Sequence, residues 1–217
     1  MRKLSLAIAM ICSASVVAAQ DVTIAALGDS LTQGYGLSQP EGFVPQLADW
    51  LNAQGLTDVE LINAGVSGDT TAGGLARAAW TLTPEVDALI VTLGGNDLLR
   101  GIDPNVSRAN LEGILEAARE AKVEVLLIGL TAPRNYGPEY KETFDAIYAE
   151  LSEEYGTLYL PSFFAGITGG SALRDSDPAL VQPYMQADGI HPNAKGVVNI
   201  VAMIGPSVIQ LIDRVRK

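Results

Sequence analysis

The sequence predicts an α/β domain in which a five-stranded parallel sheet is covered by helices on both faces. Two observations carry this prediction. Five short apolar runs alternate with segments that have the apolar spacing of helices, and nearly every run ends in glycine-rich or polar sequence. Continuous apolar strands are typical of a parallel sheet that is buried on both sides. The chain has 217 residues and 18% charged residues, which fits one ordinary folded domain.

The expected strands are the apolar runs at residues 22–27, 59–62, 88–93, 123–130 and 157–163. The segments between them repeat apolar residues at intervals of three or four, as amphipathic helices do. Helices are expected over residues 43–54, 71–82, 105–121 and 138–155. Pro192 is expected to open a last helix that ends near residue 215, because proline is favoured in a first helical turn.

Residues 1–19 have the layout of a secretory signal peptide and are set apart from the fold. Arg2 and Lys3 form a short positive region, an apolar stretch follows, and small residues lead to an expected cleavage site after Ala19. The remainder, residues 20–217, is expected to form a single domain that is secreted or periplasmic.

Two other roles for the N-terminal segment are weaker. A membrane anchor is disfavoured because the apolar stretch is shorter than the roughly 20 residues that span a bilayer. A lipoprotein attached through Cys12 is disfavoured because Ala9-Met10-Ile11 lacks the usual leucine and small residue. No later segment is expected to span a bilayer.

The processed chain is acidic and free of cysteine. Loss of Arg2 and Lys3 changes the net charge from −11 to −13, which disfavours binding to nucleic acid and to anionic membrane surfaces. Cys12 is the only cysteine in the sequence. No disulfide, thiolate nucleophile or cysteine-ligated metal is therefore expected after processing.

Polar residues gather where the expected strands end, which is the edge at which parallel sheets bind ligands. Glycine-rich signatures follow the first three strands: Gly28-Asp29-Ser30, Gly65-Val66-Ser67-Gly68 and Gly94-Gly95-Asn96-Asp97. Residues 131–137 follow the fourth strand, and residues 188–192 come after the fifth. One edge of the sheet is therefore expected to hold the chemistry.

His191 is the only histidine in the sequence and the natural candidate for a general base, since histidine is the residue type suited to that task near neutral pH. A lone histidine is more often a surface or satisfied core residue. Asp188, however, lies three residues earlier and can reach the ring Nδ1 proton. The simpler alternative is that Asp188 only caps the last helix.

Ser30 directly follows the first strand and is the candidate nucleophile, although a serine there could simply cap a helix. Its surroundings are not the Gly-x-Ser-x-Gly elbow of α/β-hydrolases. Gly68 can offer a backbone N–H, and Asn96 a side-chain amide, to a developing oxyanion. The simpler alternatives are a turn glycine and a turn or capping asparagine.

Four stretches, in order, resemble the four blocks of the SGNH, or GDSL, hydrolases. They are Gly28-Asp29-Ser30-Leu31, Gly68 within residues 63–71, Asn96 within residues 94–97, and residues 188–192. The stretches PRNYGPEY (133–140) and QPYMQADGIHP (182–192) resemble the bacterial periplasmic branch called thioesterase, lysophospholipase or arylesterase.

This resemblance implies a three-layer α/β/α domain whose five strands follow the flavodoxin-like order. It implies that Ser30 attacks the acyl carbon, that His191 acts first as base and then as acid, and that Asp188 orients His191. The backbone N–H groups of Ser30 and Gly68 and the amide of Asn96 would form the oxyanion hole. It implies hydrolysis of small carboxylic esters, and of acyl thioesters or lysophospholipids, through an acyl-serine. No metal and no cofactor is implied.

Two further groups of residues neighbour these blocks. Three aspartates are expected to satisfy loop backbone groups and not to act as acid or base: Asp29, Asp69 and Asp97. The loop after the fourth strand resembles the family's substrate-covering loop. Three of its residues could line the acyl site, or simply be packed: Ala132, Pro133 and Tyr136.

Two alternative functions stand beside the ester and thioester hydrolase. One is an SGNH enzyme for acetylated carbohydrate, which would keep the same triad with a different pocket; the branch-specific loop disfavours it. The other is a binding protein without catalysis. Loss of Ser30, Asp188 or His191 would indicate such a protein, and all three are present.

Overall fold

The computed structural model describes residues 21–217, and a five-stranded parallel sheet forms its middle layer. The strands lie in the order β2-β1-β3-β4-β5, which confirms the expected parallel sheet and its flavodoxin-like order. The strands are Val22–Gly28 (β1), Val59–Gly65 (β2), Ala88–Thr92 (β3), Glu124–Ile128 (β4) and Leu158–Leu160 (β5). The expected signal peptide, residues 1–19, lies outside the described residues.

The position of each strand in the sheet explains its composition. The central strands β1 and β3 are buried almost throughout, whereas the edge strands β2 and β5 are partly exposed. Strand β5 is shorter than the predicted run at 157–163. It stops at Leu160 because Pro161 follows and has no N–H to donate to the ladder.

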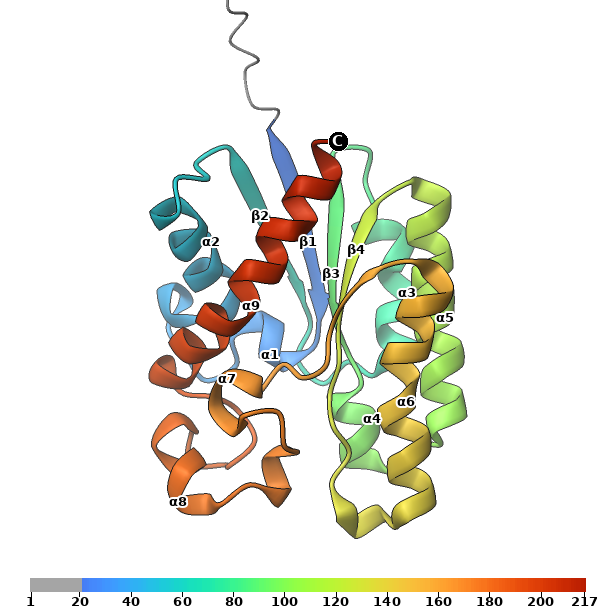
Figure 1. The fold of residues 1–217 in the computed structure, drawn as a ribbon, viewed down its shortest axis with the longest axis vertical. Coiled ribbons are helices and arrows are strands. Elements are labelled where there is room, and N and C mark those ends of the chain that lie inside the picture. The colour runs from blue at the N-terminus through green and yellow to red at the C-terminus, as the bar shows by residue number, and fades with distance from the viewer. Residues whose placement is uncertain (1–20) are drawn as a thin grey trace, which may run out of the picture.

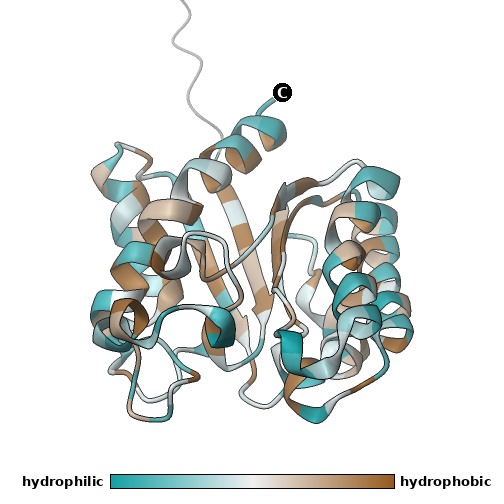
Figure 2. Cartoon of the chain, turned by 60° about the horizontal axis from the view of Figure 1, so that its bottom comes forward, coloured by the Kyte–Doolittle hydropathy of each residue, from teal (hydrophilic) through white to brown (hydrophobic). Residues whose placement is uncertain are grey.

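Helices cover both faces of the sheet and complete three layers (Figure 1). The helices of one face are α2 (Phe43–Ala53), α7 (Ala165–Thr168) and α9 (Ala194–Val215). Those of the other face are α3 (Thr71–Thr81), α5 (Pro104–Ala121) and α6 (Pro138–Tyr155). Figure 2 shows the apolar strands between these two layers, whose outer sides are more polar. This pattern is what burial of one helical face against a sheet requires.

The long helices agree with the prediction to within two residues at each end. The last helix begins later than predicted. Asn193 is its N-cap, and the Asn193 side chain accepts a hydrogen bond from the Gly196 N–H at 3.1 Å. Pro192 therefore precedes the cap, and the expectation that it opens the first turn is wrong.

Several short helices were not expected, because a single turn is too short to show a helical period. They include α1 (Ser30–Gln33), α4 (Gly95–Arg100) and α8 (Pro178–Val181). Four more turns are 3₁₀ helices: η1 (Gln39–Glu41), η2 (Arg134–Tyr136), η3 (Leu173–Asp175) and η4 (Gln182–Tyr184). Most of them lie at the edge of the sheet where the strands end (Figure 1).

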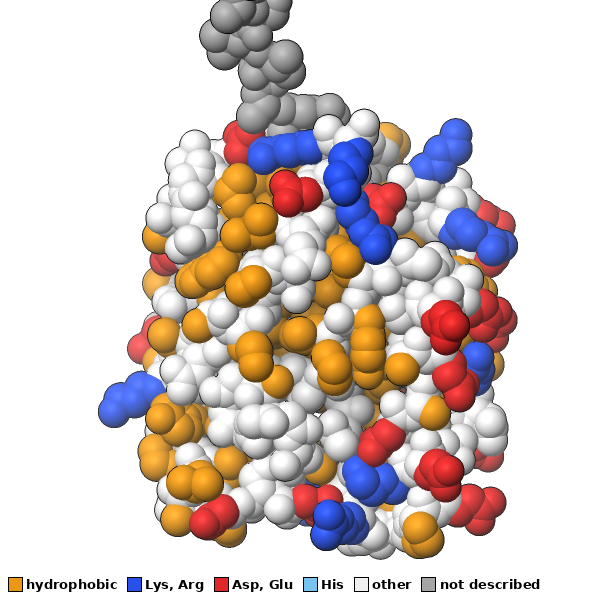
Figure 3. Space-filling view, viewed as in Figure 1, with side chains coloured by type: hydrophobic (Ala, Val, Ile, Leu, Met, Phe, Trp, Pro, Cys, Tyr) orange, Lys and Arg blue, Asp and Glu red, His pale blue; other side chains and the backbone are white. Residues whose placement is uncertain are grey.

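Helix α9 is long and apolar enough to cross a membrane by length and composition, so the expectation that no later segment qualifies is wrong. In the fold, half of its apolar window is buried, and α9 packs between α2 and α7 over the sheet. Ile200, Ile204 and Val208 supply fully buried side chains. Figure 3 shows a mostly apolar or uncharged surface along the middle of α9, whereas acidic side chains gather over α6.

The strand register brings three distant loops together. Gly28, the last residue of β1, pairs with Gly65 of β2 on one side and with Thr92 of β3 on the other. The three strands therefore end at one level. The chain order reverses at β1, and such a switch point is where open α/β sheets bind ligands.

Candidate active site

Ser30 is the first residue of α1, and Asp29 alone separates it from the end of β1. Asp29 is the N-cap of this helix, since its side chain accepts a hydrogen bond from the Leu31 N–H at 3.0 Å. Ser30 is therefore not the N-cap, which removes the simpler alternative for this serine. Its hydroxyl is left for another partner.

Two glycines allow α1 to lie directly against the strand ends. A Cβ atom at Gly28 would overlap the hydroxyl of Thr32, and a Cβ atom at Gly65 would overlap the backbone nitrogen of Gln33. Any larger residue at either position would push the helix away from the sheet. These glycines thus fix where Ser30 stands.

His191 links Ser30 to Asp188. The His191 Nε2 atom lies 2.8 Å from the Ser30 Oγ atom, and its Nδ1 atom lies 2.7 Å from an Asp188 carboxylate oxygen. Both are ordinary hydrogen-bond distances. The His191 side chain is 15% exposed, so the imidazole is shielded but open on one side. The structure brings these three predicted residues together in one hydrogen-bonded chain.

Asp188 is held by its own loop and not by the last helix. Its second oxygen accepts hydrogen bonds from the backbone N–H groups of Ile190, at 2.9 Å, and His191, at 3.0 Å. Since Asn193 caps α9, the capping alternative for Asp188 does not hold. Burial raises the pKa of Asp188, but these hydrogen bonds, with that of the imidazole, outweigh it and lower the pKa to about 2.

Two residues that the sequence prediction missed support His191. The Tyr35 ring lies against the imidazole, with 4.6 Å between the ring centroids. The Gln186 side chain donates to the carbonyl oxygens of Tyr35, at 2.7 Å, and Pro192, at 3.0 Å. The Gln186 N–H also donates to the His191 carbonyl oxygen at 2.8 Å. Gln186 thereby ties the histidine loop to the segment that follows α1.

The three predicted oxyanion-hole donors are the backbone N–H groups of Ser30 and Gly68 and the side-chain amide of Asn96. The backbone N–H groups of Ser30 and Gly68 donate no hydrogen bond to any acceptor within residues 21–217. Gly68 has a φ of +88°, a conformation that favours glycine. The Asn96 amide donates to the Asp69 carbonyl oxygen at 2.9 Å and lies 3.4 Å from an Asp29 carboxylate oxygen. The first contact fixes how this amide is turned.

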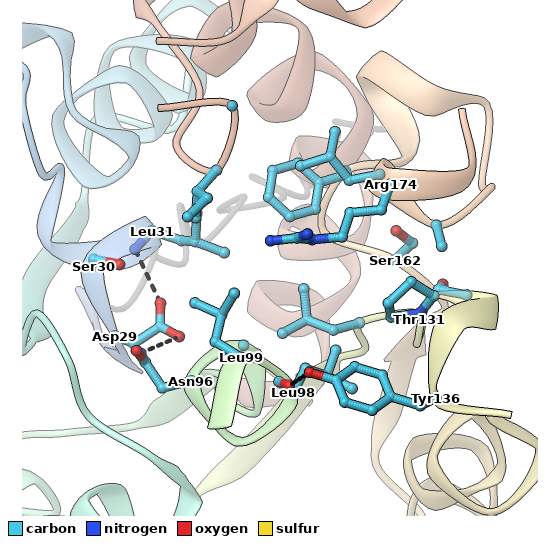
Figure 4. A pocket seen from close by; sticks show the side chains of 18 of the residues that line it. Asp29, Ser30, Leu31, Asn96, Leu98, Leu99, Thr131, Tyr136, Ser162 and Arg174 are labelled. Atoms are coloured by element: carbon cyan, nitrogen blue, oxygen red, sulfur yellow. Dashed lines mark hydrogen bonds between the residues drawn. The ribbon is translucent and has the colours of Figure 1, made fainter. Parts of the chain in front are cut away.

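Asp29 lies behind these donors and is almost completely buried, with 2% of its surface exposed. Burial raises the pKa of Asp29 to about 6, although the Leu31 N–H and the nearby His191 act in the opposite direction. Figure 4 shows its carboxylate between the Leu31 N–H and the Asn96 amide. Its contact with the Leu31 N–H makes Asp29 the cap of a helix and not the support of a loop, and that it is neither acid nor base stays a prediction.

Asp97 has the same kind of role. It accepts hydrogen bonds from the Thr71 N–H at 2.9 Å, the Thr71 hydroxyl at 2.6 Å and the Ser107 hydroxyl at 2.9 Å. These contacts join α4 to α3 and α5.

Asp69 acts through an arginine instead of a loop N–H. It forms an ion pair with Arg77 at 2.6 Å. Arg77 also donates to the carbonyl oxygens of Ala64, at 2.6 Å, and Gly28, at 2.8 Å, at the ends of β2 and β1. Asp69 therefore holds the group that satisfies these backbone oxygens.

A cleft of about 300 Å³ opens beside Ser30 and Asn96. Its walls are largely apolar and include leucines of α4, whereas the far wall carries Arg174 (Figure 4). Pro133 and Tyr136 of the predicted substrate loop line this cleft, and the Tyr136 hydroxyl donates to the Leu98 carbonyl oxygen.

Ala132 of the same loop does not line the cleft. It is fully buried, and its N–H donates to the Asp145 carboxylate at 2.7 Å. Among residues 21–217, no group of three or more His, Cys, Asp or Glu side chains is arranged to hold a metal ion.

The chain is similar to several known proteins. A family model described as GDSL-like Lipase/Acylhydrolase family matches residues 26–197. The chain is 38% identical to Esterase TesA of Pseudomonas aeruginosa over 191 residues, which covers 88% of this chain and 89% of that protein. It is also 38% identical, over 172 residues, to the Thioesterase 1/protease 1/lysophospholipase L1 of Escherichia coli, covering 79% and 76%. The crystal structure of AlinE4, described as an SGNH-hydrolase family esterase, superposes with a TM-score of 0.70 at 40% identity, covering 88% of this chain and 96% of that chain.

Proposed function

Because this chain belongs to the GDSL-like lipase/acylhydrolase family and is a carboxylic ester hydrolase, we propose that it cleaves acyl esters through an acyl-serine formed on Ser30. The observation that carries this proposal is the continuous hydrogen-bonded chain from Ser30 through His191 to Asp188. It is the arrangement that an activated serine requires: a base in contact with the nucleophile, and a carboxylate that orients the base.

In the first half of the reaction, His191 Nε2 takes the Ser30 hydroxyl proton as Oγ bonds to the acyl carbon. Asp188 stabilises the imidazolium that forms and keeps its Nδ1 proton in place. His191 then gives its proton to the departing alcohol or thiol. In the second half, water attacks the acyl-serine and His191 again acts first as base and then as acid.

The negative charge of the tetrahedral intermediate falls on the former carbonyl oxygen. We propose that the N–H groups of Ser30 and Gly68 and the amide of Asn96 receive it. Two observations support this role. Both N–H groups lack an acceptor among the described residues, and the Asn96 amide is held in place by its hydrogen bond to the Asp69 carbonyl oxygen. Each such donor typically contributes about 3 kcal/mol to the lowering of the barrier.

The apolar walls of the cleft favour acyl chains over sugars as the group held beside Ser30. The names of the relatives extend the proposal to acyl thioesters and lysophospholipids. We further propose that residues 1–19 direct the chain to the periplasm or the cell exterior, because they have the composition of a signal peptide.

The test is to assay 4-nitrophenyl esters of increasing acyl length, beside an acetylated sugar, with the chain lacking residues 1–19. We expect turnover of acyl esters and a loss of about 10⁴-fold or more in kcat for Ser30→Ala. Ser38→Ala is the matched control: Ser38 is an exposed serine that contacts Glu41, and its loss should leave the rate unchanged. Full turnover by Ser30→Ala would exclude Ser30 as nucleophile, and a preference for the acetylated sugar would favour the carbohydrate esterase.

A further inference from the structure

The far wall of the cleft carries a cation that has no partner. Arg174, in η3, lines the cleft, and within residues 21–217 its guanidinium makes no hydrogen bond and no ion pair. Its neighbour Asp175 instead faces Arg134, at 3.8 Å. Figure 4 shows the Arg174 side chain extending across the cleft, with its guanidinium directed toward the side that carries Ser30.

A second polar group faces the cleft at this wall. Ser162 is only 2% exposed as a residue but lines the cleft, and no residue in the described part of the chain accepts a hydrogen bond from its hydroxyl. Figure 4 shows Ser162 and Thr131 on the same side of the cleft as Arg174. The Ser162 hydroxyl can therefore donate a hydrogen bond to a ligand atom in the cleft.

The charges of the cleft favour an anionic ligand group at this wall. The only acidic residue in the lining is Asp29, which lies at the opposite end beside Ser30. The surrounding walls are largely apolar, so a charge on the ligand would be drawn to Arg174 and to nothing else nearby. A guanidinium with free N–H groups binds carboxylate oxygens in pairs.

The position of the cleft relative to His191 decides which part of the substrate it holds. In the proposed function, the leaving group must lie close to His191 Nε2, which protonates it. His191 itself does not line the cleft, although Gly189 and Ile190 of its loop do, at the same end as Ser30 and Asn96. Most of the lining comes from α4 and from the segments that follow β4 and β5, so the acyl group and not the leaving group is assigned to the cleft.

We propose, on the basis of the proposed esterase function, that this cleft selects acyl groups that carry a carboxylate at the end remote from the ester. Arg174 binds that carboxylate, and the Ser162 hydroxyl donates to it. Arg174 is thus a specificity-determining residue for half-esters of dicarboxylic acids.

The test compares mono-4-nitrophenyl esters of adipic, pimelic and suberic acids with the 4-nitrophenyl alkanoates of the same chain length. For each pair, the ratio of kcat/KM values measures the preference for the anionic acyl group. We expect Arg174→Gln to lower this ratio by about 5-fold at the best chain length, the effect of one charge-assisted contact made by an exposed arginine. Ser162→Ala should lower it less.

Arg134→Gln is the matched control, because it removes the same charge from the same rim at a side chain outside the cleft lining. Its ratio should change by less than about twofold, as expected for a solvent-screened charge. A further substrate, the octanoate ester of 5-hydroxy-2-nitrobenzoate, places the anion on the leaving group.

The outcomes separate this proposal from the esterase function. An unchanged ratio in Arg174→Gln, with ester turnover that still depends on Ser30, would overturn the role of Arg174 and leave the esterase function standing. A loss confined to the nitrobenzoate ester would overturn the acyl-side placement. Absence of turnover with every ester would contradict both proposals.

Discussion

Two aspartates near the nucleophile have the same side chain and opposite pKa shifts. Asp188, on the histidine side, is 36% exposed and has a pKa lowered to about 2. Asp29, on the oxyanion side, is 2% exposed and has a pKa raised to about 6. Asp188 receives three hydrogen bonds from its own loop, whereas Asp29 receives one from Leu31 and a long contact from Asn96. The number of donors, set against burial, decides the direction of each pKa shift.

This difference divides the site into two halves with different tasks. The carboxylate beside His191 stays ionised throughout the neutral range and can stabilise an imidazolium at every turnover. The carboxylate behind Asn96 has a pKa raised to about 6 and accepts a hydrogen bond from the Asn96 amide.

Asp188→Asn should have the largest effect. An asparagine keeps the shape but cannot offset the positive imidazolium, so kcat should fall by about 10³- to 10⁴-fold while KM changes little. The measurement is steady-state hydrolysis of a 4-nitrophenyl ester. Asp177→Asn is the control: Asp177 is an exposed N-cap of α8, and asparagine also caps helices. More than a tenth of the wild-type kcat in Asp188→Asn would contradict the role of this carboxylate.

Asn96→Ala should have the next largest effect, on the opposite half of the site. Loss of one oxyanion donor is expected to lower kcat by about 10²- to 10³-fold with little change in KM. The exposed Asn105, replaced by alanine, serves as control for loss of an amide. A rise in KM with unchanged kcat would place Asn96 in ground-state binding instead.

Asp29→Asn should lower kcat by about tenfold. The Asn96 amide now donates to an Asp29 carboxylate oxygen, and an amide N–H₂ group in that place would be a second donor that cannot accept this hydrogen bond. The substitution should also stabilise the fold at neutral pH. Since burial raises the pKa of Asp29 from 3.8 to about 6, its ionisation destabilises the fold as pH rises through that window. We expect the variant to gain about 1–2 kcal/mol over wild type at pH 7.5 and to lose that gain below about pH 4.

Urea unfolding at pH 4 and pH 7.5 measures this gain. An equal stability difference between variant and wild type at both pH values would show that Asp29 does not titrate in the folded protein between them. A kcat equal to that of wild type would exclude a role for Asp29 in positioning Asn96.

The contribution of Asp188 to folding stability should be the smallest effect, and its sign is opposite to that of Asp29. The pKa of Asp188 is lowered from 3.8, so its contribution to stability is present above about pH 4 and is lost as pH falls toward 2. Because the side chain is more than a third exposed, solvent screening limits this contribution to about 1 kcal/mol. Unfolding of wild type and Asp188→Asn at pH 5 and pH 2.5 tests it. If the free energy of unfolding fell more for the variant than for wild type between pH 5 and pH 2.5, ionised Asp188 would not stabilise the fold as stated.

The sequence was most informative where chemistry and periodicity are local. The apolar runs predicted the sheet, and the four blocks predicted which residues meet at its edge. Strand β5 was predicted too long because the apolar run continues past Pro161, which has no N–H for the ladder. Helices α1 and α4 have four and six residues, too few for a periodic signal to reveal them.

The contacts that the sequence could not reveal join residues far apart in the chain. Gln186 contacts the carbonyl oxygen of Tyr35, 151 positions away. Arg174 lies outside every motif, and only the fold brings η3 over the cleft. Ala132 shows the converse: its place in the substrate loop suggested a lining residue, yet packing turned it inward.

In the proposed function, Ser30 is the nucleophile, and His191 and Asp188 activate it. The most direct measurement is covalent trapping with a 4-nitrophenyl alkylphosphonate, followed by intact-mass analysis and peptide mapping. We predict one adduct per chain, located on Ser30, absent from Ser30→Ala and formed at least about 10²-fold more slowly in Asp188→Asn. An adduct on any other residue, or equal labelling of Ser30→Ala, would contradict the claim.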